Sequence, residues 1–393
     1  MNVSFVDYPK QHAKYPEIEE AILRVCRSRA RILQNEVKTF EEGLAKFVGT
    51  KYALGVANGT DALIMVLRYL KQKNGWQDGD EVISVGHTFH ATIEAIVHNG
   101  LTPVLVDVGE DGMMNVFEVE KVITPKTKAI LPVHLMGDMV DMHRLGLLVQ
   151  DQNLNRIGNK ISLVEDACQA LGSEFRWQTE SRKAGSISSA GAFSFFPAKI
   201  LGCYGDGGGI TTNDEELYNE IKNMREHYKF SEHPGFGFNS RLDELQASIL
   251  NVKIKYLPDM LRRRQEIADL YFEGLKDLEK AGKIKLPTKR NGRVFQDYII
   301  QVPDIYPENY TKDTVIFQTG DWNKTLFGKR DALADFLKEQ GIETLKNDYH
   351  FPIPKPEHTV KLESQTLRLP CNDVLEDDEI KYVIQKVNEF YQK

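Results

Sequence analysis

Lys199 stands in a setting that suggests covalent chemistry. It lies in the run FSFFPAKILGCYGDGGGI (193–210), between aromatic residues and a glycine-rich segment. Burial among apolar side chains disfavours an ammonium ion, so this setting predicts a lowered pKa and a neutral amine that can form a Schiff base with a carbonyl group. The alternative is a structural lysine whose ammonium group reaches water past an apolar junction. The order of residues differs from that of a phosphate-binding loop, in which lysine follows GxxxxG.

A second candidate is the run VEDACQA (164–170), which contains Asp166 and Gln169 at the end of a strand-like stretch. In open α/β sheets, ligands bind at the carboxyl ends of the strands. A carboxylate beside valine and leucine needs a positive partner, and a protonated pyridine nitrogen would be one. The alternative is that Asp166 caps a following helix.

Two further stretches could hold a ligand. In VANGTDALIMVL, Gly59 and Thr60 open a predicted helix directly after a strand, where N–H groups and a hydroxyl could bind phosphate. A plain helix cap by Asn58 or Thr60 is the alternative. Phe89, in VGHTFHAT, could lie on a planar ring or belong to the core. Together, a Schiff-base lysine, a carboxylate, a phosphate cup and an aromatic lid are the parts of a pyridoxal 5′-phosphate site.

The elements that must position these residues alternate between strands and helices. Amphipathic spacing predicts helices at 17–31 and 88–100 and a long helical stretch at 242–275. Compact β-branched runs predict strands at 81–86, 103–108, 129–135, 161–167, 190–196 and 207–213. This alternation predicts an α/β fold with a mostly parallel central sheet covered by helices on both faces.

The pattern changes after the long helical stretch. A strand is predicted at 293–302, a helix at 330–341 and a terminal helix at 377–393. We therefore expect a large domain over 1–254 and a smaller C-terminal α+β domain over 255–393. The polar segment 303–328 is expected to be a long loop or insertion, to which we assign no role.

Composition and charge exclude several classes of function. The chain has 393 residues, of which 41% are hydrophobic, and a formal net charge of −7, with no basic stretch typical of nucleic-acid binding. Its four cysteines are far apart and lack metal-ligand spacing, which predicts reduced thiols in the cytoplasm and no metal site. No signal segment or membrane span is expected. An early GxGxxG motif is missing, which argues against a nicotinamide oxidoreductase.

Ordered motifs over nearly the whole chain resemble the DegT/DnrJ/EryC1/StrS sugar aminotransferases, which have fold type I of the pyridoxal-phosphate-dependent enzymes. The matching motifs include GTDAL, HTFHAT, PVHLMG, EDACQALGSEF, SFFPAKILGCYGDGGGITTND, GFNSRLDELQASIL and YHFPIP. The resemblance implies a pyridoxal 5′-phosphate cofactor and a homodimer with shared active sites. In the last motif, Phe351 stands where tyrosine is common in the family.

The resemblance also implies a role for each matching position. Lys199 would form the Schiff base, Asp166 would pair with the ring nitrogen, and Gln169 would lie near the ring hydroxyl. The remaining cofactor contacts would come from Gly59, Thr60 and Ser194 to the phosphate, Phe89 stacked on the ring, and Asn239 reaching the phosphate from the other subunit. Arg241 and His350 would approach the substrate.

The implied reaction is transfer of an amino group from an amino acid, with L-glutamate as donor, to a nucleotide-linked keto sugar. It would serve the biosynthesis of an amino sugar for a surface glycan or a glycosylated natural product. The motifs NSRLD and GCYGDGG resemble members that act at C3 of a dTDP- or UDP-linked sugar, whereas members acting at C4 tend to show NYRMTN. Related dehydratases replace the lysine with histidine, and this chain keeps Lys199. The alternatives are a C4 aminotransferase and a non-catalytic regulatory protein on the same fold, which would not need Lys199 and Asp166 together.

Overall fold

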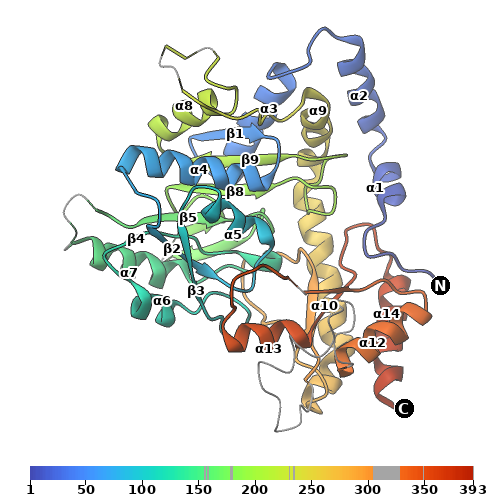
Figure 1. Cartoon of the computed structure of the whole chain (residues 1–393). Coiled ribbons are helices and arrows are strands. Elements are labelled where there is room, and N and C mark those ends of the chain that lie inside the picture. Colours follow the sequence, from blue (N-terminus) through green and yellow to red (C-terminus); the bar gives the residue numbers. More distant parts are fainter. Residues whose placement is uncertain are drawn as a thin grey trace.

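A computed structural model describes residues 1–154, 156, 159–177, 180–229, 231–232, 235–303, 328–347 and 349–392. Within them, the central element is a seven-stranded sheet of order β1-β9-β8-β5-β4-β2-β3 (Figure 1). Its strands are β1 (Tyr52–Val56), β2 (Glu81–Val85), β3 (Thr102–Val106), β4 (Thr127–Ile130), β5 (Ser162–Asp166), β8 (Ala190–Ser194) and β9 (Gly208–Thr212). Strand β9 is antiparallel to both neighbours and the other pairs are parallel, which confirms the predicted mostly parallel sheet.

Helices cover both faces of this sheet, because successive strand residues point to opposite sides. Ala53 and Ile83 belong to one hydrophobic cluster, and their neighbours Leu54 and Val82 belong to another. The first cluster includes residues of α3 (Asn35–Val48), α6 (Val116–Val122), α7 (Met142–Leu154) and α9 (Glu244–Lys253). The second includes residues of α4 (Gly59–Asn74), α5 (His90–Val97) and α8 (Glu215–Met224). Burial on both faces explains why these strands are almost continuously apolar.

A second, three-stranded sheet lies toward the C-terminus, with order β10-β12-β11 and antiparallel pairing. Its strands are β10 (Tyr298–Gln301), β11 (Leu345–Lys346) and β12 (Thr366–Leu369). Residues of α10 (Leu257–Lys280), α12 (Lys329–Glu339) and α14 (Asp377–Gln392) pack with it in a third hydrophobic cluster. The long α10 helix runs from beside the large sheet toward α12 and α14 (Figure 1). It contributes residues to both the main core and this cluster, and the division at residues 254/255 stays a prediction.

Several short elements were not predicted. They are α1 (Tyr8–Lys14), the hairpin of β6 (Glu174–Trp177) and β7 (Glu180–Lys183), α13 (Glu357–Gln365) and the strands β11 and β12. Helix α2 (Glu17–Arg27) ends before the predicted residue 31. The strand predicted at 129–135 ends at Ile130, and a 3₁₀ turn forms at Leu135–Gly137. The expectation for 303–328 falls almost entirely outside the described residues.

In the parts of the chain that the structure describes, no helix is long and apolar enough to span a membrane. Those parts also contain no cluster of three or more His, Cys, Asp or Glu side chains that could hold a metal ion. All four cysteines are free thiols.

Candidate active site

Asp166 is the last residue of β5, at the carboxyl edge of the large sheet. Its buried carboxylate accepts a hydrogen bond from the Thr92 hydroxyl at 2.7 Å and from the Cys168 backbone N–H at 3.2 Å. Its own N–H donates to the Pro132 carbonyl at 3.0 Å. A turn rather than a helix follows at 168–172, so Asp166 does not cap a helix. The carboxylate is therefore held in a defined orientation at the edge where ligands of such sheets bind.

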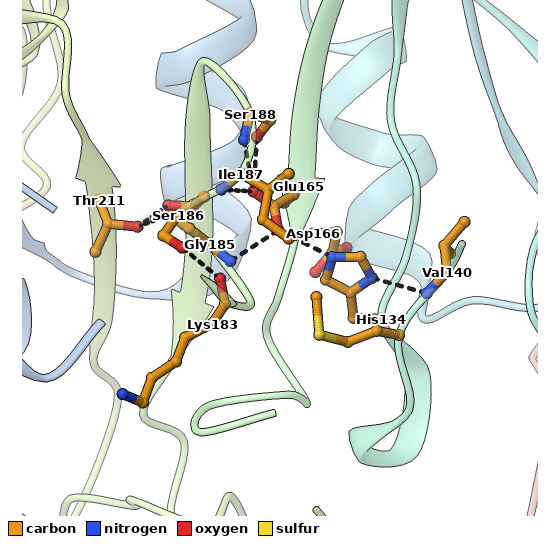
Figure 2. A network of polar contacts seen from close by, with 12 residues as sticks. His134, Val140, Glu165, Asp166, Lys183, Gly185, Ser186, Ile187, Ser188 and Thr211 are labelled. Atoms are coloured by element: carbon orange, nitrogen blue, oxygen red, sulfur yellow. Dashed lines mark hydrogen bonds and ion pairs between the residues drawn. The ribbon is translucent and has the colours of Figure 1, made fainter. Parts of the chain in front are cut away.

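The neighbouring Glu165 points to the other side of β5 and anchors the strand (Figure 2). Its carboxylate accepts hydrogen bonds of 2.8–2.9 Å from the backbone N–H groups of Gly185, Ile187 and Ser188 and from the Ser188 hydroxyl. The His134 ring lies 3.1 Å away through Nε2, while its Nδ1 accepts from Val140 N at 3.3 Å. Burial raises the pKa of Glu165, but these hydrogen bonds outweigh it, so the net pKa is lowered. This network fixes the strand that carries Asp166.

Lys199 lies in the turn after β8, where its N–H donates to the Phe196 carbonyl at 2.8 Å. Burial lowers the pKa of Lys199; Arg368 lowers it further, whereas Cys168, Asp297 and Asp166 act in the opposite direction. The direction of the net shift is the predicted one. A buried amine whose pKa is lowered, within the electrostatic reach of Asp166, is the arrangement that Schiff-base chemistry requires.

The expected aromatic surroundings of Lys199 need a correction. Phe193 and Phe195 are buried in the core, and Phe195 packs edge-on against Phe40 with ring centroids 5.1 Å apart. Phe196, however, is 49% exposed. Phe193 belongs to β8, whereas Phe195 and Phe196 follow the end of that strand at Ser194, and only Phe193 and Phe195 pack into the main core. Burial is still the largest cause of the lowered pKa of Lys199, and the charged groups at the site modify that shift.

Gly59 brings the N-terminus of α4 against the ends of β5 and β8. A Cβ atom at Gly59 would lie 2.8 Å from Cys168 Sγ and 3.0 Å from Ser194 Cβ, so a larger residue would not fit. Asn58 caps α4, because its side chain accepts from Asp61 N at 2.8 Å. The cap was one of the two predicted readings, and it satisfies the N–H of Asp61 while the N–H groups before it have no partner within the helix. Such a helix end favours an anion.

The glycine-rich segment after Lys199 has a packing explanation. A Cβ atom at Gly208 would lie 2.3 Å from the backbone carbon and oxygen of Asn58. Strand β9 therefore passes in backbone contact with the residue that caps α4. Glycine at this position lets the start of α4 pack directly against β9. Strand β9 is the neighbour of β8, the strand that leads to Lys199.

Phe89, Gln169 and Tyr349 line the same region. Phe89 is 53% exposed, and its ring is perpendicular to that of buried Tyr349 with centroids 6.2 Å apart. Gln169 Oε1 accepts from Met136 N at 3.0 Å. Burial raises the pKa of Tyr349, and a hydrogen bond with Gln169 acts against this. A half-exposed ring beside buried polar groups is suited to covering a planar ligand.

The predicted substrate residues are placed less favourably. His350 is exposed, whereas the adjacent Tyr349 is buried within the site. Arg241 forms an ion pair with Glu226 at 2.9 Å. Asn239 is exposed, and the next residue, Ser240, accepts from Ala57 N at 3.2 Å beside the start of α4. The roles of Asn239, Arg241 and His350 thus stay predictions.

Four residues that were not predicted from the sequence also lie at this site. Thr92 orients Asp166, and Tyr349 lies against Phe89. Buried Asp297 and partly exposed Arg368 form an ion pair that acts on the pKa of Lys199 and Tyr349. Thr92 and Tyr349 lie inside the motifs HTFHAT and YHFPIP, which could have suggested them. Asp297 and Arg368 lie in none of the motifs named above. Only their contact in the folded structure identifies them as residues of the site.

These residues fit pyridoxal 5′-phosphate. The start of α4 offers helix N–H groups close to Ser194, and the absence of a side chain at Gly59 allows this close approach. Buried Asp166 offers a carboxylate for the ring nitrogen, half-exposed Phe89 offers a face for the ring, and Lys199 offers an amine of lowered pKa. The fold and this site define a pyridoxal-phosphate-dependent aminotransferase of fold type I.

The chain belongs to the DegT/DnrJ/EryC1/StrS aminotransferase family, whose sequence profile matches residues 13–388. It is 35% identical to the dTDP-3-amino-3,6-dideoxy-alpha-D-galactopyranose transaminase of Aneurinibacillus thermoaerophilus, over 99% of both chains. It is 39% identical to the UDP-2-acetamido-2-deoxy-3-oxo-D-glucuronate aminotransferase of Pseudomonas aeruginosa, over 97% of this chain and 98% of that one. It is also 34% identical to a pleiotropic regulatory protein of Geobacillus stearothermophilus, over 100% of this chain and 99% of that one.

A solved structure supports the same fold. The crystal structure of S. venezuelae DesV in complex with a ketimine intermediate superposes with a TM-score of 0.84 at 32% sequence identity. The match covers 100% of this chain and 99% of that chain.

Proposed function

We propose that this chain transfers an amino group from L-glutamate to C3 of a nucleotide-linked 3-keto sugar, the nucleotide being dTDP or UDP. The observation that carries the proposal is the meeting of Lys199, Asp166 and the N-terminus of α4 at one edge of the sheet. The names of the transaminase relatives and the motif NSRLD support C3 over C4. We propose that it acts in the cytoplasm and supplies an amino sugar for a surface glycan or a glycosylated natural product.

In this proposal, different residues of the site bind different parts of the cofactor. When bound, pyridoxal 5′-phosphate supplies an electron sink for the bond that breaks at the donor's α-carbon. We assign the phosphate to Gly59, Thr60 and Ser194 at the start of α4, where helix N–H groups favour an anion. Phe89 would cover the ring, and Gln169 would lie at its hydroxyl. Asp166 would hold a proton on the ring nitrogen, because an opposite charge within hydrogen-bond reach favours the charged form.

Lys199 has two tasks in this proposal. Its amine would hold the cofactor covalently at rest, and once released it would accept the proton that leaves the donor's α-carbon and give that proton back later in the reaction. Both tasks need a neutral amine, and burial lowers the pKa of Lys199 in that direction. Thr92 keeps the Asp166 carboxylate oriented while the proton moves, since its hydroxyl is fixed in turn by Thr88 at 2.6 Å.

A regulatory role is the second candidate, and one relative carries such a name. A purely regulatory protein would not require Lys199 and Asp166 at the same edge of the sheet. The catalytic proposal accounts for both residues, for the close approach of α4 to Ser194 at Gly59 and for the exposure of Phe89.

A substrate panel tests the proposed reaction. Purified protein loaded with pyridoxal 5′-phosphate would be given L-glutamate and dTDP- or UDP-linked 3-keto or 4-keto sugars, with the 3-keto sugars generated in situ. We expect glutamate-dependent formation of 3-amino sugars, with kcat/KM for the matching 4-keto sugar at least about tenfold lower, because a displaced carbonyl loses the productive geometry. Product would be measured by mass spectrometry. Amination of 4-keto sugars alone would overturn the C3 assignment, and amination of neither would favour the regulatory candidate.

We further propose a homodimer in which Asn239 and Arg241 complete the partner's site. The exposed Asn239 follows Phe236, whose side chain is 99% exposed. Burial of this ring against a second copy of the chain would remove apolar surface from water. Chains carrying Lys199→Ala would be mixed with chains carrying both Asn239→Ala and Arg241→Ala. Each heterodimer should then have one intact site and about half the wild-type activity.

Heterodimers would be isolated with two different affinity tags, so that subunit exchange is demonstrated independently of activity. Each variant mixed with wild-type chains serves as the control for exchange. If isolated heterodimers stay inactive, each chain builds its own site, and the cross-subunit role of Asn239 and Arg241 is wrong.

A further inference from the structure

We propose that Gln296 is a positioning residue for Lys199, which it holds by binding the backbone on both sides of it. This inference rests on the proposed function. Gln296 Oε1 accepts from Ile200 N at 3.0 Å, and Gln296 Nε2 donates to the Ala198 carbonyl at 2.9 Å. One amide thus brackets Lys199 with its acceptor on one side and its donor on the other. The residue is buried, at 5% exposure.

The two hydrogen bonds of Gln296 are important because Lys199 lies in an irregular turn. Residues 196–203 enter no helix or strand, so no regular ladder of hydrogen bonds fixes the backbone around Lys199. Lys199 N donates to Phe196 O, and Cys203 N donates to Phe195 O, both at 2.8 Å. A lysine side chain has four rotatable bonds, and the position of its amine depends on where its Cα is held. A displacement of about 1 Å at a reacting group can cost about 10²-fold in rate.

The backbone of Gln296 is in turn held by an arginine of α10. Arg264, a buried residue of α10, donates to the carbonyls of Phe295 at 3.1 Å and of Gln296 at 2.8 Å. The next residue, Asp297, pairs with Arg368 of β12. The segment before β10 is therefore tied to α10 and to the three-stranded sheet. Through Gln296, these C-terminal elements set the place of a lysine that belongs to the large sheet.

A matched set of variants separates positioning from packing. Gln296→Met keeps the size of the side chain and removes both hydrogen bonds. Gln296→Glu keeps the acceptor for Ile200 N, loses the donor to Ala198 O, and adds a negative charge near Lys199. Gln246→Met is the control, because Gln246 Oε1 accepts from Tyr204 N at 2.9 Å farther along the same connection without bracketing the lysine.

The readouts do not depend on the sugar substrate. The rate at which pyridoxal 5′-phosphate attaches covalently to apo protein and the pH titration of its bound absorbance both report on the Lys199 amine, and melting temperature reports on folding. For Gln296→Met we expect attachment and kcat to fall about tenfold, with a change of less than about threefold in KM. The Gln246→Met control should attach cofactor at the wild-type rate. Gln296→Glu should raise the pH midpoint of the titration above that of Gln296→Met, because the added charge favours the protonated form.

Two results would overturn parts of this scheme, and they are distinguishable. If wild-type protein attaches the cofactor at Lys199 while folded Gln296→Met behaves like Gln246→Met in rate and titration, the positioning role is wrong and the proposed function stands. If Gln296→Met fails to fold, the same comparison is made with Gln296→Glu, and a wild-type attachment rate there overturns the role. If the wild-type protein itself attaches no cofactor, the proposed function falls, and this inference falls with it.

Discussion

Replacing Lys199 with alanine is expected to abolish turnover, with kcat falling by at least about 10⁴-fold. The variant loses both the covalent link to the cofactor and the group that moves the proton. Lys199→Arg should be equally inactive, because a guanidinium stays charged at every accessible pH and cannot act as a neutral amine. Steady-state assays with the substrates of the panel would measure the loss, and melting temperatures would show that both variants are folded.

Covalent labelling makes this prediction specific to one residue. Borohydride reduction of the loaded protein followed by peptide mapping should label Lys199. The chain offers a demanding comparison in Lys253, a buried lysine whose pKa burial lowers to about 8 and whose Nζ donates to the Gly202 carbonyl at 2.5 Å. Lys253→Met should lower the melting temperature and still be labelled at Lys199. Label on Lys253 in the wild-type protein would show that the assignment is wrong.

Asp166→Asn is expected to lower kcat by about 10²-fold with little loss of stability. A hydrogen bond to a charged group contributes about 1.5–3 kcal/mol, which corresponds to roughly 10- to 150-fold in rate. The amide cannot carry the charge that keeps the ring nitrogen protonated. Its fold should tolerate the change, because the amide oxygen can still accept from Cys168 N, and the Thr92 hydroxyl can rotate to accept from the new NH₂ group. Turnover at the wild-type rate would refute the role of Asp166.

Glu165→Gln provides the matched control one residue away on the same strand. Its carboxylate faces the loop at 185–188 instead of the site, so we expect it to lose stability, by about 3 kcal/mol, rather than kcat. The NH₂ group of the new glutamine cannot accept a hydrogen bond, so it would leave backbone N–H donors that now bind the Glu165 carboxylate without an acceptor. Because the pKa of Glu165 is lowered on folding, its contribution is present above the unfolded value of about 4.3 and is lost as the pH falls through the folded value. Acid titration of the melting temperature should therefore be shallower in the variant than in the wild type.

Much of the fold could be predicted from local patterns. The runs at 81–86, 161–167 and 190–196 became β2, β5 and β8 with ends that shift by one or two residues. Asp166 was expected at the end of a strand and is there, because the end of a strand depends on nearby residues. The start of α4 directly after β1 could be predicted for the same reason. Among the elements that were missed, α1 and α13 are short and lack a long periodic signal, whereas α3 is a helix of 14 residues that was also not predicted.

The surroundings of Lys199 were decided by tertiary structure. The sequence by itself determined that a lysine follows β8 and that glycines follow the lysine, and the resemblance of its motifs assigned the chemistry. It did not determine that Phe196 would be exposed, that Asp297 and Arg368 would act on the amine, or that Gln296 would bracket it. Gln296 lies 96 positions from Ile200 along the chain. Periodicity reports which face of its own element a residue occupies, whereas a contact across such a distance exists only once the two sheets and α10 have packed together.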